Sequence, residues 1–215
     1  MRPFLVAVEG NIGAGKTTLL NQLKDWPMAE CQEEPIDSWT NVANNNLLDL
    51  MYKQPKKYTF HFQVLAALKQ PILQVSKPIQ IVERSLISQL YCFGANALKR
   101  NDITPLEFEL LSQLFNRCIT WQTPDLIIYL KSSPEMTLKR IQNRNRIEEN
   151  NITLDYLSDI HQLHEKTFGN SDNDHTIVID TDQFLNSFEI YNLKQKIVKH
   201  SYDHFKINFD YKLFN

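Results

Sequence analysis

Glycine is the residue that this sequence has least of for its length. The 215 residues contain five glycines, whereas an average usage of roughly 7% would give about fifteen. Three of the five, Gly10, Gly13 and Gly15, lie close together near the N-terminus. Glycine adopts left-handed backbone conformations without steric cost. A chain that uses little glycine but concentrates it in one place therefore has a special backbone requirement there.

Cysteine, net charge and long apolar runs are also scarce. The three cysteines are far apart and form no CxxC pair, so we expect neither a disulfide framework nor a zinc site. We expect the protein to lie in a reducing, cytoplasmic compartment. The formal net charge of -2 argues against a broad surface for nucleic acid or for anionic membranes. No apolar run approaches the roughly 20 residues of a membrane-spanning helix. No targeting segment is evident either, because the apolar residues 4–8 are followed at once by Glu9.

Short apolar runs alternate with helical patterns along the chain. We predict strands over residues 4–8, 79–82, 126–130 and 176–179, and a short strand before residue 33. We predict helices over residues 17–23, 44–53, 58–73, 86–98, 105–121, 134–146 and 154–168, and a C-terminal quarter that is helical and then irregular. This alternation is typical of an α/β fold with a parallel sheet, here of about five strands, flanked by helices. We expect a single domain over residues 1–215, with ligands at the carboxyl ends of its strands.

The clustered glycines belong to a phosphate-binding motif. Residues 10–17 match G-x-x-x-x-G-K-[ST] in full, with a predicted strand before them and a predicted helix after them. Backbone N–H groups in such a loop surround a phosphate, the lysine neutralises the β and γ phosphates, and the hydroxyl of the last residue is offered to Mg²⁺. The predicted ATP-binding residues of this P-loop are Gly10, Asn11, Ile12, Gly13, Ala14, Gly15, Lys16, Thr17 and Thr18.

A P-loop by itself identifies a nucleotide site and not a reaction. The N-K-x-D segment with which GTPases read their base is missing from the sequence. Motor-type ATPases need an apolar strand that ends in aspartate, and residues 176–180 provide one. That reading stays open, although Thr181 stands where a glutamate is expected to follow.

Two acidic groups follow predicted strands. Glu34 is held extended by Pro35, and a carboxylate beside the P-loop can accept a proton from an acceptor hydroxyl. Glu83 and Arg84 end the second long strand, where the acid can hold Mg²⁺ and the arginine can reach the transferred phosphoryl group. Taken singly, Glu34 is also compatible with an ordinary solvated side chain, and Glu83 and Arg84 with a structural ion pair that caps a helix.

The most basic stretch contains Arg140, Arg144 and Arg146. Three arginines at this spacing repel one another unless an anion lies among them. Arginines on a lid, here residues 140–150, can neutralise the charge of a transferred phosphoryl group. The alternative is a solvated basic helix face.

These segments together resemble the deoxynucleoside kinase family, which includes deoxycytidine, deoxyguanosine and mitochondrial-type thymidine kinases and the broad-specificity insect enzyme. The resemblance runs in order from about residue 4 to residue 182. It is carried by residues 9–18, Glu34-Pro35 with Trp39, residues 47–52, Phe62-Gln63, residues 83–85 with 91–93, residues 140–149 and residues 163–165. It implies the P-loop kinase fold, ATP and Mg²⁺ as donor and metal, and a homodimer.

The resemblance also implies roles for the site residues. Glu34 is the general base on the 5′-hydroxyl of a deoxynucleoside, and Arg84 holds that oxygen. Thr17 and Glu83 place Mg²⁺, and Arg140 contributes to the nucleotide site. The catalytic set is Glu34, Arg84, Lys16, Arg144 and Arg146. The deoxynucleoside is bound by Glu34, Trp39, Met51, Tyr52, Phe62, Gln63, Gln70, Arg84, Gln89, Phe93 and Glu149.

Within that set, Tyr52 and Glu149 recognise the sugar 3′-hydroxyl, Gln63 bonds the base edge and Phe93 stacks on the base. The sequence departs from the family where members that favour deoxycytidine and purines have an Arg and an Asp, because here Gln70 and Gln89 occupy those positions. Thymidine-accepting members have apolar residues there. Loss of the Arg–Asp pair favours thymidine and other pyrimidines, while two amides still permit a purine or cytosine.

Two other functions compete with this one. A nucleoside monophosphate kinase, such as a thymidylate kinase, needs cationic groups for a second substrate phosphate, which Glu34 would repel. A non-catalytic nucleotide-binding subunit would tolerate the loss of Glu34 or Arg84, but both are present.

Overall fold

The computed structural model describes residues 2–70, 76–169 and 174–205. Contacts within the chain divide it into two compact units, Met1–Asp182 and Gln183–Asn215. Each unit is described by itself. The expectation of one domain over the whole chain stays a prediction.

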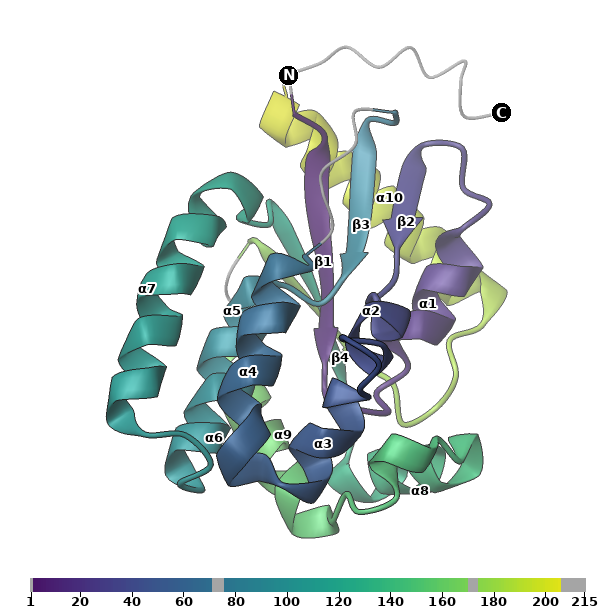
Figure 1. The fold of residues 1–215 in the computed structure, drawn as a ribbon. Coiled ribbons are helices and arrows are strands. Elements are labelled where there is room, and N and C mark those ends of the chain that lie inside the picture. The colour runs from purple at the N-terminus through teal and green to yellow at the C-terminus, as the bar shows by residue number, and fades with distance from the viewer. Residues whose placement is uncertain (1, 71–75, 170–173, 206–215) are drawn as a thin grey trace. The chain divides into compact units, whose positions relative to one another are not determined.

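The first unit is built on one sheet of five parallel strands, shown in Figure 1. The strands are β1 (Phe4–Gly10), β2 (Ala29–Gln32), β3 (Ile79–Glu83), β4 (Leu126–Lys131) and β5 (Thr176–Asp180). Their order across the sheet is β2-β3-β1-β4-β5. All residues of β1 and β3 are buried, as expected for strands covered on both faces. The predicted α/β fold with a parallel sheet is thereby confirmed.

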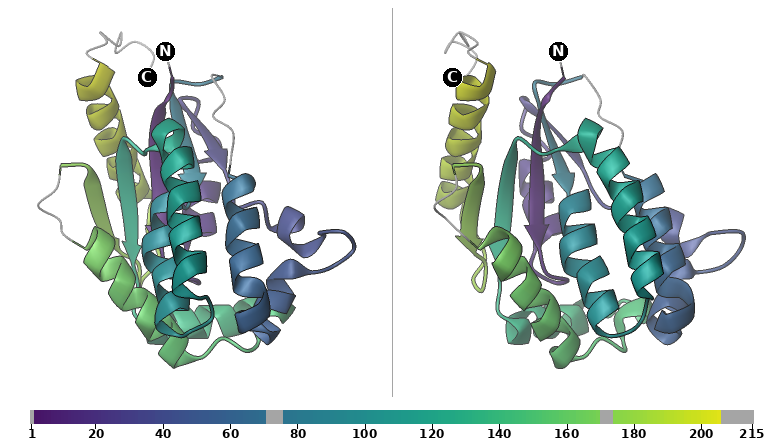
Figure 2. Two further views of the ribbon diagram at one scale, coloured as in Figure 1. Left: turned by 60° about the vertical axis from the view of Figure 1, so that its left-hand side comes forward. Right: turned by 90° about the vertical axis from the view of Figure 1, so that its left-hand side faces the viewer.

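Helices follow the strands in the predicted alternation. They are α1 (Lys16–Leu23), α2 (Ile36–Thr40), α3 (Leu47–Lys53), α4 (Pro55–Leu68), α5 (Leu86–Ser88), α6 (Ala95–Lys99), α7 (Pro105–Gln122), α8 (Pro134–Arg144) and α9 (Leu154–Phe168). A π-helix, η1 (Gln89–Gly94), lies between α5 and α6, and a 3₁₀ turn, η2 (Ile147–Glu149), follows α8. Figures 1 and 2 show α4, α5 and α7 over one face of the sheet, with α1 against the other face. The same views place α3 and α8 at the end to which the strands point.

Three helices differ from the sequence-based expectation in where they begin or in their continuity. In addition, the helix expected over residues 134–146 ends at Arg144, because Asn145 adopts a left-handed backbone with φ of 53°. The helix expected from residue 44 begins at Leu47, because Asn46 caps it by accepting a hydrogen bond from the Asp49 N–H. The next helix begins at Pro55 and not at Tyr58, since proline suits the first turn. Its last residue is Leu68, and residues 71–73 of the expected helix lie outside the described part.

The third difference concerns the expected helix 86–98. The structure divides it into α5, the π-helix η1 and α6. Short π-helical segments inside α-helices are frequent at functional sites. Here η1 carries Gln89 and Phe93, both of which the resemblance assigns to the base pocket.

The second unit contains α10 (Ser187–Phe205). Asn186 stabilises the start of α10 by accepting hydrogen bonds from the N–H groups of Phe188 and Glu189. Over the described residues, no helix has the length and apolar character that crossing a membrane requires.

Candidate active site

The strand ends bring the predicted catalytic segments together. Val8 in β1 is paired with Glu83 in β3, and Gln32 in β2 is paired with Val82. The P-loop after β1, Glu34 after β2 and Arg84 after β3 therefore meet at the same edge of the sheet. This edge is where open parallel sheets bind ligands.

The clustered glycines are explained by the P-loop backbone. Gly10, Gly13 and Gly15 all have positive φ angles, of 146°, 79° and 98°. A Cβ on Gly13 would lie 2.7 Å from the Thr137 carbonyl oxygen of α8, so the loop packs closely against the lid helix. Left-handed backbone of this kind turns successive N–H groups inward and forms an anion-binding concavity.

Lys16 begins α1 and its side chain is buried beneath the loop. Its Nζ donates to the Asn11 carbonyl at 3.0 Å and to the Gly10 carbonyl at 3.3 Å, and lies 4.0 Å from a Glu83 oxygen. Burial, and then the nearby Arg84 guanidinium, lower the pKa of Lys16 to about 8, against the opposing effect of Glu83. The lysine is thus cationic at neutral pH, but only by a small margin.

This margin predicts a pH dependence. A polyphosphate is held by the protonated lysine, and the cation is lost as the pH rises through about 8. We expect kcat/KM for ATP, which reports on the free enzyme, to fall above about pH 8, whereas kcat at saturating ATP holds to higher pH because bound phosphates favour the charged form. Steady-state rates between pH 6.5 and 9.5 measure this. A flat kcat/KM over the whole range would contradict it.

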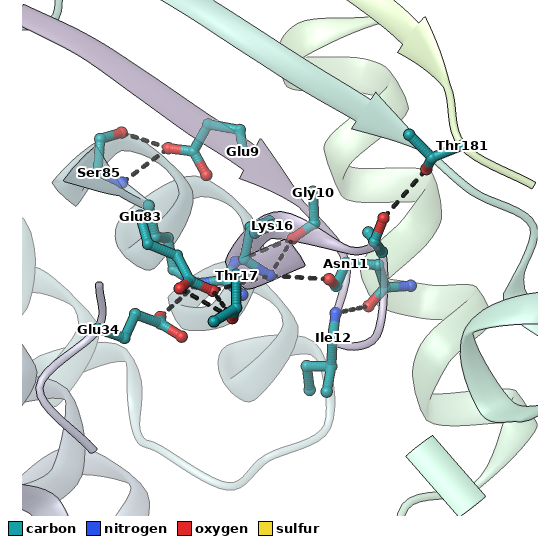
Figure 3. A network of polar contacts seen from close by, with 12 residues as sticks. Glu9, Gly10, Asn11, Ile12, Lys16, Thr17, Glu34, Glu83, Ser85 and Thr181 are labelled. Atoms are coloured by element: carbon teal, nitrogen blue, oxygen red, sulfur yellow. Dashed lines mark hydrogen bonds and ion pairs between the residues drawn. The ribbon is translucent and has the colours of Figure 1, made fainter. Parts of the chain in front are cut away.

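Thr17 and Glu83 form the candidate metal-binding pair. The Thr17 hydroxyl lies 3.1 and 3.0 Å from the two Glu83 carboxylate oxygens (Figure 3). Burial, and then the neighbouring Glu34 carboxylate, raise the pKa of Glu83. A hydroxyl and a single carboxylate are the oxygen donors that Mg²⁺ takes beside substrate phosphates. The described residues hold no cluster of three or more metal-ligating side chains, so such an ion would depend on the nucleotide for the rest of its ligands.

Glu34 and Arg84 form an ion pair across the ends of β2 and β3. The Arg84 Nε donates to a Glu34 carboxylate oxygen at 2.7 Å, and its Nη1 donates to the Gly10 carbonyl at 3.1 Å. Burial alone would raise the pKa of Glu34, but Arg84 and Lys16 outweigh it and hold the pKa below its usual value. Glu34 is therefore an ionised carboxylate beside the P-loop, in the state that a general base requires.

Arg84 has a strained backbone conformation, and two residues for which the sequence predicted no role, Glu9 and Ser85, hold it there. Its φ is 69°, a region that non-glycine residues seldom occupy except where the surrounding structure enforces it. Its N–H donates to the Val8 carbonyl, and the next residue, Ser85, donates from both its N–H and its hydroxyl to the buried Glu9 carboxylate (Figure 3). A glutamate within an otherwise apolar buried strand was the available sequence signal.

Phe93 and a buried histidine flank the arginine. The Arg84 guanidinium lies over the Phe93 ring, 4.5 Å from its centroid. The Phe93 and His164 rings are nearly perpendicular, with their centroids 5.8 Å apart. Burial, followed by the Arg84 charge, lowers the pKa of His164 to about 3. His164 is therefore neutral, and it packs against Phe93 without repelling Arg84.

The predicted acceptor wall is assembled from α2, α3 and α4. One buried cluster contains Trp39, Met51 and Phe62, with Tyr52 at its margin. The Trp39 and Phe62 rings pack in a T-shaped arrangement, with their centroids 5.2 Å apart. An aromatic wall of this kind suits a flat ligand such as a nucleobase.

Three buried polar atoms of this region have no hydrogen-bond partner among the described residues. They are the Oε1 atoms of Gln63 and Gln89 and the Nε1 of Trp39. Buried polar atoms are nearly always satisfied in native proteins, so these three favour a polar ligand edge between them. Gln70 lies just beyond the end of α4 and is half-buried. Its assignment to the base pocket stays a prediction.

The lid arginines are paired within the chain. Arg144 and Arg146 both bond the buried Glu149 carboxylate, Arg146 at 3.0 Å. The sequence argument required an anion among these arginines, and Glu149 is such an anion. Arg146 also lies near enough to Glu34 to help lower its pKa. Burial, then Tyr156 and Glu149, raise the pKa of Tyr52, so Glu149 borders the acceptor wall as well.

The remaining predicted nucleotide-site residues hold the loop or face outward. Arg140 of α8 donates to the Ser132 hydroxyl and, at 2.5 Å, to the Thr181 carbonyl, which ties the lid helix to the segment after β5. The Asn11 amide donates to the Leu157 carbonyl of α9, and its Oδ1 accepts from the Ile12 N–H. Thr18 lies on the exposed side of α1.

Comparison with known proteins gives a consistent family. A sequence model of the deoxynucleoside kinase family matches residues 6–205. The chain is 37% identical over 172 residues to a probable deoxycytidine kinase of fowlpox virus, covering 75% of the chain and 70% of that protein. It is 34% identical over 168 residues to mitochondrial thymidine kinase 2 of Macaca fascicularis, covering 75% of the chain and 63% of that protein. It is 32% identical over 194 residues to mitochondrial deoxyguanosine kinase of Xenopus laevis, covering 74% of the chain and 71% of that protein.

The matches confirm the resemblance that the motifs carried, and the parallel sheet agrees with the P-loop kinase fold of the family. The chain belongs to the deoxynucleoside kinase family and is an enzyme of that family.

Proposed function

We propose that the protein transfers the γ-phosphoryl group of ATP to the 5′-hydroxyl of a deoxynucleoside. The observation that carries this proposal is the ionised Glu34 carboxylate, bonded to Arg84 at 2.7 Å and facing the P-loop lysine. A carboxylate at that place can accept a hydroxyl proton.

The site residues divide the chemistry between them. Glu34 accepts the proton of the 5′-hydroxyl as that oxygen forms a bond to the γ-phosphorus, and the bond from phosphorus to the leaving ADP oxygen breaks. Arg84 holds the acceptor oxygen, and Lys16 neutralises the phosphates. Thr17 and Glu83 would hold Mg²⁺, which would supply charge neutralisation at the phosphate oxygens.

Arg144 and Arg146 are placed to stabilise the transferred group. Both guanidinium groups form ion pairs with Glu149, at the end of the sheet where the P-loop lies. Preorganised donors of this kind can neutralise the charge that develops on a transferred phosphoryl group.

A kinase acting on a nucleoside monophosphate is less favoured by this geometry. Its second substrate phosphate would meet the Glu34 carboxylate, which would repel it. A non-catalytic subunit would have no need of the strained Arg84 backbone, whose φ is 69°.

The base preference is proposed to lean towards thymidine and other pyrimidines. The relatives are named for deoxycytidine, thymidine and deoxyguanosine, so their names do not decide it. The Gln63 and Gln89 amides are neutral and can rotate, which lets each present a donor or an acceptor to a base. We expect kcat/KM with Mg²⁺ and ATP to be higher for thymidine and deoxycytidine than for the two purine deoxynucleosides. Equal or higher values for the purines would contradict the preference but not the reaction.

We also propose that the chain acts as one kinase domain and forms a homodimer, as the resemblance implies. Leu106 and Leu110 lie one turn apart on α7 and are 70% and 47% exposed. Sedimentation velocity of the purified protein tests the dimer.

A further inference from the structure

Thr181 joins the P-loop to two other parts of the site. It follows β5 and is 6% exposed. Its hydroxyl donates to the Ala14 carbonyl in the P-loop at 3.1 Å and lies 3.2 Å from the Lys131 carbonyl at the end of β4 (Figure 3). Its own carbonyl accepts from Arg140 of the lid helix.

The hydroxyl has one proton to share between the two carbonyls. The Lys131 carbonyl already accepts from the Thr181 N–H at 2.8 Å. Ala14 is fully buried, and within the described residues the Thr181 hydroxyl is the donor that reaches its carbonyl. An unpaired buried carbonyl is costly, so the proton stabilises the structure most when it points to Ala14.

Fixing this carbonyl fixes a neighbouring donor. In a trans peptide the C=O of one residue and the N–H of the next point in opposite directions. The Ala14 carbonyl and the Gly15 N–H belong to one peptide unit. When the Ala14 carbonyl is held towards Thr181, the Gly15 N–H points away from Thr181 and into the P-loop. Nothing within 4 Å would contact a side chain at Gly15, so packing acts on this peptide from the Ala14 side and not from the Gly15 side.

We propose that Thr181 is a positioning residue that orients the Ala14–Gly15 peptide so that the Gly15 N–H faces the phosphates of ATP. The inference rests on the proposed function in taking the P-loop ligand to be ATP. Thr181 reacts with nothing itself and acts through the loop that it holds.

Kinetics of two variants test the proposal. Thr181→Val keeps the shape but removes the donor, and Thr181→Ser keeps the donor. We expect the valine variant to raise KM for ATP about tenfold, the scale of one lost hydrogen bond, with KM for the deoxynucleoside within about twofold of wild type, and the serine variant to remain near wild type. Ser158→Ala, which removes a hydroxyl bonded to the Leu154 carbonyl at the surface of α9, is the control and is expected to change neither KM.

The scarcity of glycine permits a direct spectroscopic test. Ala14-Gly15 is the one Ala-Gly pair in the sequence, so protein labelled with carbonyl-¹³C alanine and ¹⁵N glycine gives a single carbonyl-to-amide correlation, from this peptide. In Thr181→Val we expect the Ala14 carbonyl signal to move upfield or broaden, and the Gly15 amide to shift less on addition of ATP. In Thr181→Ser we expect the wild-type signal.

Several results would overturn the proposal. They are an unchanged correlation in Thr181→Val, an equal rise in both KM values, or a serine variant as impaired as the valine variant. If Thr181→Val does not fold, Thr181→Ala is compared with Thr181→Ser in its place. A wild-type protein that binds ATP but phosphorylates no deoxynucleoside would contradict the proposed function alone, because the spectroscopic test needs only ATP binding.

Discussion

Replacement of Glu34 by glutamine is expected to lower kcat by about 10²-fold or more while ATP binding is retained. Glutamine has the shape of glutamate but cannot accept the 5′-hydroxyl proton, and a positioned base contributes about 10²–10⁴-fold. Arg84 donates to the Glu34 oxygen at 2.7 Å and can still donate to an amide oxygen. The measurement is steady-state turnover with ATP binding determined separately.

Glu33→Gln is the matched control, because Glu33 precedes Glu34 but is exposed. It is expected to behave as wild type. Thermal unfolding of both variants separates lost chemistry from lost folding. Turnover of Glu34→Gln within a few-fold of wild type, in a folded protein, would remove Glu34 from the role of base.

Replacement of Arg84 by lysine is expected to lower kcat by about 10²–10³-fold, the scale for loss of one preorganised donor. The guanidinium bonds Glu34 and the Gly10 carbonyl at the same time and lies over the Phe93 ring. A lysine ammonium lacks the planar fork that makes these contacts together, although it keeps the charge. The effect is measured on kcat at saturating concentrations of both substrates.

Arg100→Lys provides the control for this change. Arg100 is exposed and is paired with Asp159 at 3.1 Å, so its replacement is expected to leave kcat unchanged. If Arg84→Lys turned over like Arg100→Lys, charge alone would explain the role of Arg84, and the proposed geometry would be wrong.

The P-loop is the part of the candidate site that the sequence predicted best, because its conformation depends on residues close together in the chain. The P-loop glycines lie within residues 10–15, and their positive φ angles follow from a motif complete within eight residues. Arg84 directly follows β3 and Glu34 comes two residues after β2, so the end-of-strand rule brings both to one edge of the sheet. The ion pair between them required the neighbouring positions of β2 and β3 in the sheet.

Contacts across the strand order were beyond sequence reasoning. Glu9 lies on β1 and Ser85 comes two residues after the neighbouring strand β3, far away in the chain, and Thr181 bonds a carbonyl at Ala14. Each contact depends on β3 and β4 flanking β1 and on β5 lying beyond β4. Periodicity in a single sequence carries no information about that order.

The lid illustrates a different limit. The sequence predicted basic side chains that need an anion, and we expected the transferred phosphoryl group of ATP to be that anion. The structure shows both Arg144 and Arg146 on Glu149, a residue assigned by resemblance to the sugar. A short turn, η2, brings the carboxylate back onto these arginines, and turn geometry of that precision does not follow from residue spacing.

The central claim is that a deoxynucleoside hydroxyl, and not a nucleotide phosphate, receives the phosphoryl group. One reaction tests it most directly: wild-type protein with ATP and Mg²⁺, given the four natural deoxynucleosides, with the thymidine ¹³C-labelled, together with unlabelled thymidylate, and analysed by mass spectrometry for phosphorylated products. We predict deoxynucleoside 5′-monophosphates and no thymidine diphosphate. Formation of thymidine diphosphate without any new monophosphate would contradict the account.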